Sequence, residues 1–206
     1  MDISLNLGAV EYYYGNDDEF TVDDFESFIS HPFNRNKKFE LINGQVVLMA
    51  GNASPNHQTI KGEIFAELRN YLKGRKCRVF DDLNLYLFTE ELGKCRNIYQ
   101  PDIMVCCDES IISKRGCEGV PDMIVEVISK STGDYDYGSK RNNYIRYGVG
   151  EIWLVDLFIN QISIDKNGFN YKYKFNDNIK VNIFPDLLID FAEILAMVDK
   201  SDLKWI

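Results

Sequence analysis

The sequence lacks the features of a signal peptide, of a membrane span and of a cysteine-rich zinc site. Its five cysteines are odd in number and form no Cys-x-x-Cys pair, which predicts neither a disulfide framework nor a four-cysteine zinc site. The first twenty residues lack the basic start and apolar centre of a signal peptide, and no apolar run approaches the roughly 18 residues of a membrane span. We therefore expect a cytoplasmic protein in a reducing compartment.

Basic residues are fewer than acidic residues, because the chain has 23 Lys and Arg against 32 Asp and Glu, which gives a net charge of -9. This charge disfavours non-specific attraction to nucleic acid or anionic membranes, so any polyanion must meet a local basic patch. The main candidate patch contains Arg69, Lys73, Arg75, Lys76 and Arg78, and a smaller one contains Arg35, Lys37 and Lys38. The alternative for the main patch is a solvated helix end, where basic side chains suit the helix dipole.

Internal repeats, linkers and low-complexity segments are absent as well. The 206 residues are 45% apolar and 13% aromatic, which is enough for one sizeable core and gives little support for two. We predict a single domain over residues 1–206, with a loosely ordered acidic start at residues 1–20.

Apolar periodicity predicts the elements of the fold. The dipeptide Asn43-Gly44 lies between two apolar runs and predicts a β-hairpin, while Ser54 and Pro55 begin the clearest helix. The predicted helices cover residues 21–31, 54–72, 137–148 and 191–198. Strand-like runs separate them, and three short runs before the last helix predict a C-terminal antiparallel meander. We predict an α/β (α+β) fold with a mixed central sheet covered by helices on both faces.

One acidic residue, Glu126, lies within the strand-like run "DMIVEVI". It shares a strand face with Ile124 and Ile128, while Val125 and Val127 point the other way, so both faces are apolar. An ionised carboxylate there must pair with a cation, bind a metal or become protonated. The alternatives are an exposed strand end and a structural ion pair with a lysine.

A second acid, Asp102, follows Pro101 and opens the apolar run "IMVCC". Two acids at one end of adjacent strands could converge on a divalent ion, although an Asp after Pro often only begins a strand. The same dipeptide recurs at Pro121-Asp122, but Asp122 lies about 13 Å from Glu126 by strand rise. We interpret Asp122 as a turn residue.

A lysine, Lys140, opens the predicted helix that follows, with Tyr144 and Tyr147 on the same side. It could neutralise charge on a phosphate undergoing attack. The alternative is a surface pair with Asp136, one turn earlier.

The stretches "FELINGQVVLMAGNASPNHQ", "QPDIMVCC", "PDMIVEVISKST" and "KRNNYIRYGVGEIWLVD" occur in this order between Phe39 and Asp165. Together they resemble the Uma-two family of putative restriction endonucleases, within the PD-(D/E)XK nuclease superfamily. The resemblance implies a restriction-endonuclease-like fold, in which a central mixed sheet is flanked by helices and has a metal site at one end.

By this resemblance, Asp102 and Glu126 are the two catalytic acids, and they bind Mg²⁺ or Mn²⁺ together with the Val127 carbonyl. The simple pattern places a lysine where this sequence has Ile128. The family takes the lysine from the following helix, which makes Lys140 the candidate, with Lys130 as a second one.

Two further residues match the family more loosely. Glu40 of "FELINGQ" could approach the metal from the hairpin, or be a cross-strand acid. His57 of "SPNHQ" could contact a phosphate from the first turn of its helix, or be an ordinary helix-start residue. The family commonly has acids where Asn43 and Gln45 stand, but neither position is an assigned ligand.

These residues predict a metal-dependent endonuclease that hydrolyses DNA phosphodiester bonds, reaches DNA through a local basic patch and has no membrane partner. By analogy with enzymes that cut both strands, a homodimer is an option. One alternative is a non-catalytic nucleic-acid-binding or accessory protein with the same fold. Another is a metal-independent hydrolase that uses Asp102 and Glu126 as acid and base.

Overall fold

The computed structural model describes residues 3–7, 10–14, 19–35, 37–49, 53–89, 94–129, 133–201, 203 and 205. The chain forms two compact units. The first unit contains Met1–Asn52, Asn84–Gln100 and Ile112–Gly119, and the second contains Ala53–Leu83, Pro101–Ile111 and Val120–Ile206. Because neither unit is a continuous stretch of sequence, a single domain over residues 1–206 remains our prediction.

The first unit contains a sheet with the strand order β1-β2-β4-β3-β7-β6-β9. Its elements are β1 (Ile3–Leu7), β2 (Val10–Tyr14), α1 (Val22–Ser30), β3 (Lys38–Ile42), β4 (Gln45–Met49), β6 (Leu85–Thr89), β7 (Lys94–Tyr99) and β9 (Cys117–Glu118). The predicted hairpin is confirmed, because Asn43 and Gly44 join β3 to β4 with φ angles of 52° and 81°. A capping box between Thr21 and Asp24 begins α1, which confirms the helix predicted over residues 21–31.

Strands β1 and β2 fall within residues 1–20, for which we predict a loosely ordered start. They pair with each other, and β2 also pairs with β4. The sequence "VEYYY" of β2 is rich in residues that favour strands, and "ISLNL" of β1 pairs with it along its whole length.

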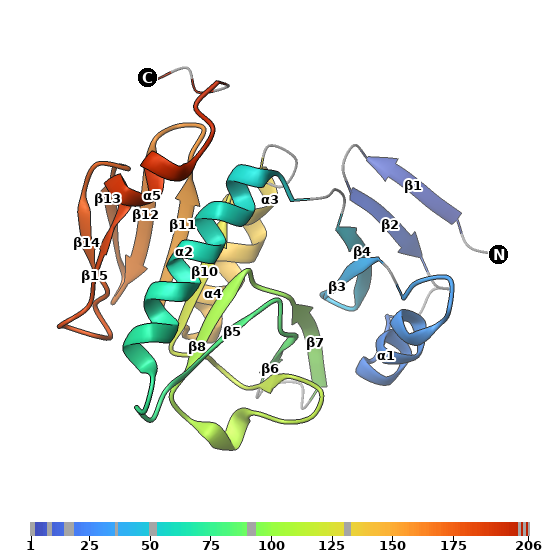
Figure 1. Cartoon of the computed structure of the whole chain (residues 1–206). Helices are drawn as coiled ribbons and strands as arrows, with labels where there is room; N and C mark the ends of the chain where they lie inside the picture. The colour runs from blue at the N-terminus through green and yellow to red at the C-terminus, as the bar shows by residue number, and fades with distance from the viewer. Residues whose placement is uncertain are drawn as a thin grey trace. The chain divides into compact units, whose positions relative to one another are not determined.

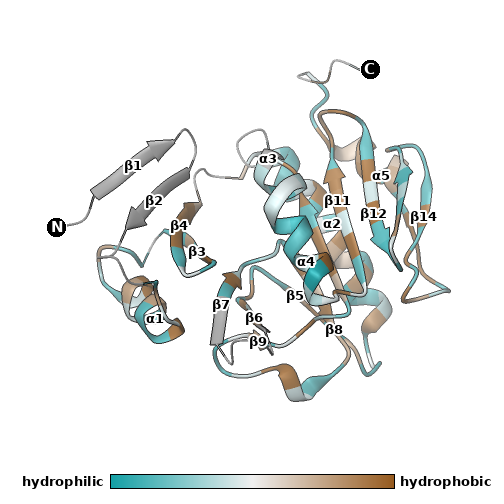
Figure 2. Cartoon of the chain, turned by 180° about the vertical axis from the view of Figure 1, so that it is seen from behind, coloured by the Kyte–Doolittle hydropathy of each residue, from teal (hydrophilic) through white to brown (hydrophobic). Residues whose placement is uncertain are grey.

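The second unit contains a mixed sheet with the strand order β13-β12-β11-β10-β8-β5. These strands are β5 (Arg78–Asp81), β8 (Ile103–Cys106), β10 (Met123–Val127), β11 (Glu151–Asp156), β12 (Gln161–Lys166) and β13 (Phe169–Tyr173). Strand β10 pairs parallel with β11 and antiparallel with β8. Every residue of these three strands is buried, so the sheet is covered on both faces as predicted. Figure 2 shows that the residues of β8 and β11 are largely hydrophobic.

Helices cover the two faces of this sheet (Figure 1). The helical elements are α2 (Pro55–Leu72), the 3₁₀ turn η1 (Glu109–Ile111), α3 (Gly133–Tyr135), the π-helical segment η2 (Asp136–Lys140), α4 (Arg141–Tyr147) and α5 (Phe191–Met197). On one face, α2 and α5 share an apolar core with Val125, Val127 and Trp153. On the other face lies α4, whose Tyr144 is fully buried. In the part of the chain that the structure describes, no helix combines the length and apolar character needed to cross a membrane.

The predicted C-terminal meander is confirmed only for β12 and β13, which pair antiparallel. The predicted third strand, Lys180–Phe184, is wrong. Strand β14 (Asn178–Lys180) ends at Lys180 and pairs instead with β15 (Leu188–Asp190). Directly after it, the Phe184 amide donates to the Val181 carbonyl in a tight turn, and Pro185 has no N–H for a strand ladder.

A disulfide joins Cys77 to Cys107, which corrects the prediction that cysteine pairing is absent. The register pairs Arg78 of β5 with Cys106 of β8, and one further residue places Cys77 opposite Cys107. A sequence separation of 30 residues gives no sign of this pairing, because only the strand register brings the two thiols together.

Two glycines give opposite predictions for stability. In Gly150→Ala the new Cβ would lie 2.8 Å from the Asp122 carbonyl oxygen, beside the start of β11, so we expect a loss of about 1–3 kcal/mol. In Gly62→Ala the Cβ meets open space on α2, and we expect a gain of about 0.5–1 kcal/mol. Urea unfolding followed by circular dichroism measures both values. Equal stability of the two variants would contradict this packing at Gly150.

Candidate active site

Glu126 lies in the middle of the sheet in strand β10 and is only 4% exposed. The Lys140 ammonium nitrogen lies 2.9 Å from Glu126 Oε1, and the Tyr144 hydroxyl donates to the same oxygen at 2.8 Å. Lys140 and Tyr144 are buried as well. A buried carboxylate is costly unless a cation and hydrogen bonds accompany it, and these two residues supply both.

The segment from η2 into α4 carries Lys140 and Tyr144 to the sheet. Lys140 is the last residue of a π-helical turn, which is a feature frequent at functional sites. Two contacts hold the segment against the sheet. Arg141 forms a bidentate ion pair with Asp165 of β12, with both N···O distances at 2.6 Å, and Tyr137 donates to Asp156 of β11 at 3.2 Å. Lys140 therefore approaches Glu126 from a fixed backbone.

Asp156 lies on the same sheet face as Glu126. The parallel register pairs Val127 with Val155, so the next pair is Ile128 with Asp156. Ile128 is on the same face as Glu126, and Asp156 beside it therefore lies on that face too, one alternate position after Glu126 along the strand direction. Burial raises the pKa of Asp156 above its ordinary value. Burial, with Asp156 beside it, also raises the pKa of Tyr137 above its ordinary value.

Asp102 lies next to Glu126 at the same end of the sheet. The antiparallel register pairs Ile103 with Val125, and one more step places Asp102 opposite Glu126 with both side chains on one face. The Val127 amide donates to Asp102 Oδ2 at 2.8 Å. The Asp102 carboxylate thus accepts from the Val127 amide in place of a backbone carbonyl of β8, at the point where that strand begins.

The first turn of α2 brings His57 to Asp102. Ser54 caps this helix by accepting from the His57 amide, and Pro55 occupies the first position. His57 Nε2 lies 3.2 Å from Asp102 Oδ2. His57 Nδ1 is buried and has no hydrogen-bond partner among the described residues.

Lys61 and Asp82 also belong to this end of the sheet, and sequence reasoning missed both. Lys61 is buried and forms an ion pair with Asp82, whose amide donates to the Asp102 carbonyl at 3.4 Å. Lys61 lies one turn after His57 on α2, so the two side chains share a face. A lysine between Ile60 and Ile64 on the buried side of the helix was the signal that could have revealed it.

The donor set at this site suits a hard divalent cation. In the described part of the chain, no group of three or more His, Cys, Asp and Glu side chains could hold a metal ion. A bound ion would therefore rely on Asp102, Glu126, a backbone carbonyl and water. The N–H and C=O of a strand residue point to the same edge, and the Val127 N–H points to Asp102, so the Val127 carbonyl also faces this side. Oxygen donors of this kind are those that Mg²⁺ and Mn²⁺ prefer.

The predicted site residues divide into three groups. The structure brings Asp102, Glu126, Lys140, Tyr144 and His57 together at one end of the second sheet. Glu40 lies in the first unit, where it is buried and accepts from the Gln100 amide at 3.0 Å. Lys130 lies outside the described residues. Asp122 is a structural turn residue, as predicted, because its carboxylate accepts from the Cys107 amide at 2.6 Å.

The fold matches that of a solved nuclease-like structure. The crystal structure of a "putative nuclease belonging to DUF820" from Anabaena variabilis ATCC 29413 superimposes with a TM-score of 0.68. The match covers 86% of this chain and 98% of that chain at 17% sequence identity. At this identity the likeness shows the fold, and it confirms the predicted class of mixed α/β sheet and flanking helices.

The family follows from the sequence match. The model of the Uma2 family, described as "Putative restriction endonuclease", matches residues 22–191, so the chain belongs to this family, as its motifs indicate. The chain is also 29% identical over 120 residues to "Uncharacterized protein slr1290" of Synechocystis sp. (strain ATCC 27184 / PCC 6803 / Kazusa). That match covers 58% of this chain and 60% of the relative, which is less than two thirds of the relative's length.

The contact between Lys140 and Glu126 predicts a strong coupling in stability. Lys140→Met alone leaves the buried Glu126 carboxylate without its ammonium partner, and we expect a loss of about 3–5 kcal/mol. In Lys140→Met with Glu126→Gln the charge is gone and Tyr144 can still donate to the amide oxygen. We expect this double variant to lie within about 1 kcal/mol of the wild type.

Urea unfolding of the two single variants and the double variant, in the presence of EDTA, measures this coupling. EDTA ensures that a metal ion does not replace the ammonium. Additive losses in the double variant would contradict the ion pair.

Proposed function

We propose that this chain is a divalent-metal-dependent nuclease that hydrolyses DNA phosphodiester bonds. Its active site would contain Asp102, Glu126 and Lys140. The observation that carries the proposal is the meeting of two buried carboxylates on adjacent strands with a buried lysine. Like charges on neighbouring strands repel each other, and a divalent ion between them is a physical reason to hold them together.

The residues of the chain divide the work of hydrolysis. Asp102, Glu126 and the Val127 carbonyl would hold Mg²⁺ or Mn²⁺, and such an ion lowers the pKa of bound water and polarises a phosphodiester. Lys140 stabilises the negative charge that develops on the attacked phosphate as water adds to phosphorus and the P–O bond to the leaving strand breaks. His57 and the Val127 amide orient Asp102, while Tyr144 orients Glu126.

Family membership supports DNA as the substrate, because the family is described as "Putative restriction endonuclease" and enzymes of that kind cut DNA. The net charge of -9 requires a local basic surface for such a substrate, and the second unit has one in the segment from Arg69 to Arg78.

A non-catalytic nucleic-acid-binding role is the second candidate, and one observation favours it. Lys140 and Tyr144 both contact Glu126 Oε1, so the carboxylate already has partners without a metal ion. A binding protein with this fold would keep Lys140 because the buried Glu126 carboxylate needs a cationic partner.

The repeated Pro-Asp dipeptide provides a matched test of catalysis. Asp102→Asn removes a proposed metal ligand, and we expect Mn²⁺-dependent cleavage of plasmid DNA to fall at least about a hundredfold. Asp122→Asn makes the same chemical change at a turn residue and retains the oxygen that accepts from the Cys107 amide, so cleavage should persist. Gel electrophoresis with and without EDTA measures both rates. Equal cleavage by both variants would remove Asp102 from the mechanism.

Metal binding can be measured without any substrate. Calorimetric titration of Mn²⁺ should give saturable binding to the wild type and none to Glu126→Gln, with circular dichroism confirming that both are folded. The amide keeps the shape of the side chain and the oxygen that Tyr144 contacts, so loss of binding reports on charge. A folded wild type that binds no Mn²⁺ would favour the non-catalytic role.

A further inference from the structure

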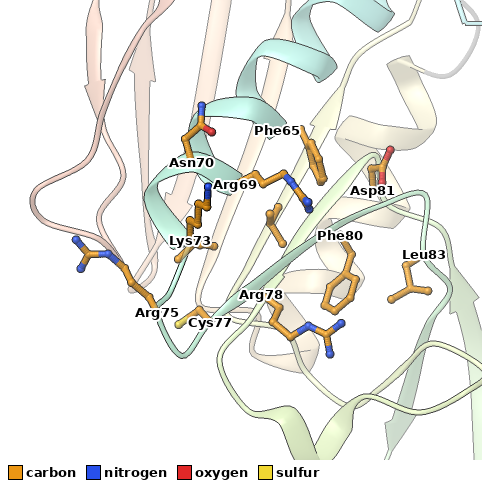
Figure 3. A pocket seen from close by; sticks show the side chains of 12 residues that line it. Phe65, Arg69, Asn70, Lys73, Arg75, Cys77, Arg78, Phe80, Asp81 and Leu83 are labelled. Atoms are coloured by element: carbon orange, nitrogen blue, oxygen red, sulfur yellow. The ribbon is translucent and has the colours of Figure 1, made fainter.

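A pocket of about 620 Å³ lies between the C-terminal half of α2 and strand β5 (Figure 3). Both elements belong to the second unit, and the residues that line the pocket do not include Glu126, Lys140 or Tyr144. Its basic lining residues are Arg69, Lys73, Arg75 and Arg78. Figure 3 shows Arg69 extending from α2 toward β5 beside Phe65, whereas Arg75 points away from the other basic side chains.

The positive charge of this pocket is not neutralised locally. Asp81 is the only acid among its lining residues. The four basic side chains are exposed, and none of them forms an ion pair with any residue that the structure describes. The helix dipole accounts for cations in the last turn of α2, such as Arg69, but not for Arg78, which belongs to β5. In a chain of net charge -9, such a cluster indicates a site for an anion.

The pocket also contains aromatic surface. Phe65 of α2 and Phe80 of β5 both line it and are partly exposed. The Arg78 guanidinium lies over the Phe80 ring, 4.9 Å from its centre, so a cation and a π-face are presented together. Cys77 forms part of the wall, and its disulfide to Cys107 ties this end of β5 to β8. Cationic groups beside aromatic rings are typical of grooves that bind single-stranded nucleic acid.

The pocket lies within reach of a strand bound at the acids. Asp81 of β5 pairs with Ile103, the residue after Asp102, so Arg78 is about 13 Å from the level of Asp102 at about 3.3 Å per residue. Along α2, Arg69 is about 18 Å from His57 at about 1.5 Å per residue. These lengths correspond to about four or five nucleotides of one strand in B-form DNA at about 3.4 Å each, and fewer in an extended strand.

We propose that this pocket binds an unpaired nucleotide of the substrate strand, a few nucleotides from the bond that is cut. Arg69, Lys73 and Arg78 hold its phosphates, and its base lies against Phe65 and Phe80. A continuous duplex would use only the cations, because its bases are stacked inside the helix, whereas an unpaired base also uses the aromatic rings. The substrate is then DNA with a single-stranded segment, such as an overhang. This inference rests on the proposed function for the position of the cut, but its test requires no cleavage.

The test measures binding in the Glu126→Gln background with EDTA, so that neither metal binding nor hydrolysis contributes. The probe is fluorescein-labelled oligodeoxythymidine of about twelve nucleotides, compared by anisotropy with a blunt duplex. Arg69→Ala with Arg78→Ala should weaken binding of the single strand about tenfold or more. It should also reduce the slope of log K against log salt by about 1.4, which is two contacts at about 0.7 each.

The aromatic contribution is tested by Phe80→Leu, which keeps apolar volume but removes the π-face. We expect it to weaken binding of the single strand about fivefold or more and to leave binding of the blunt duplex unchanged. The control for charge is Lys172→Ala with Lys174→Ala, which removes two exposed cations in and beside β13, at the opposite edge of the same sheet. Binding by this control should match the parent, and thermal unfolding verifies that each variant is folded.

The outcomes separate this inference from the proposed function. Unchanged affinity in Arg69→Ala with Arg78→Ala, or equal losses in the control variant, would overturn the pocket as a nucleic-acid site. Equal losses for single strand and duplex, with no effect of Phe80→Leu, would overturn the unpaired nucleotide and leave a duplex backbone. If metal-dependent cleavage is absent while the single strand still needs this pocket, the proposed hydrolysis fails and the binding site stands.

Discussion

The need to satisfy one buried carboxylate determines much of the second unit. Glu126 lies in the strand that is covered on both faces, where an isolated charge would be too costly to keep. Its partners, Lys140 and Tyr144, come from the helical segment of η2 and α4, which follows β10 in the chain. The chain therefore has to fix that helix on the sheet, and the bidentate pair of Arg141 with Asp165 does so two strands away.

The same principle recurs on the helix that covers the opposite face. His57 and Lys61 are one turn apart on α2, and each meets an acid at the end of the sheet, Asp102 and Asp82 respectively. Three acids therefore gather at one end of the sheet, each with a basic partner: Asp102 with His57, Asp82 with Lys61, and Glu126 with Lys140. A pair with both partners buried, such as Lys140 with Glu126, adds little net stability, because desolvation offsets its attraction. The cost of such a pair makes more sense for a site that performs chemistry than for a scaffold.

The sequence predicts the class of fold, and it singles out some residues of the candidate site. Glu126 and Asp102 stand out because a charge inside or beside an apolar run must have a partner, and the hairpin at Asn43-Gly44 stands out because few residues tolerate its φ angles. The disulfide of Cys77 with Cys107 could not be predicted, since it depends on the register of two strands that are far apart in sequence.

Other features also depend on partners that are distant in sequence. Strand β2 pairs with β4, which a single sequence does not reveal. Lys61 was missed because a lysine on a helix is usually solvated, and only the position of Asp82 shows why this one is buried. What a residue contacts across the sheet is tertiary information, and a single sequence contains it only where chemistry leaves few options.

The distribution of charge explains how so acidic a chain could still approach a polyanion. The acids at the end of the sheet are held in pairs with cations, whereas Arg69 and Arg78 form no ion pair with the described residues. The two regions are separated by about 13–18 Å along β5 and α2. This separation exceeds the Debye length of about 8 Å at physiological ionic strength, so salt screens the acids from the two arginines and they lower the positive potential there only weakly. Under the proposed function, net charge would limit non-specific attraction, while the local field of the pocket would decide where a nucleic-acid strand is held.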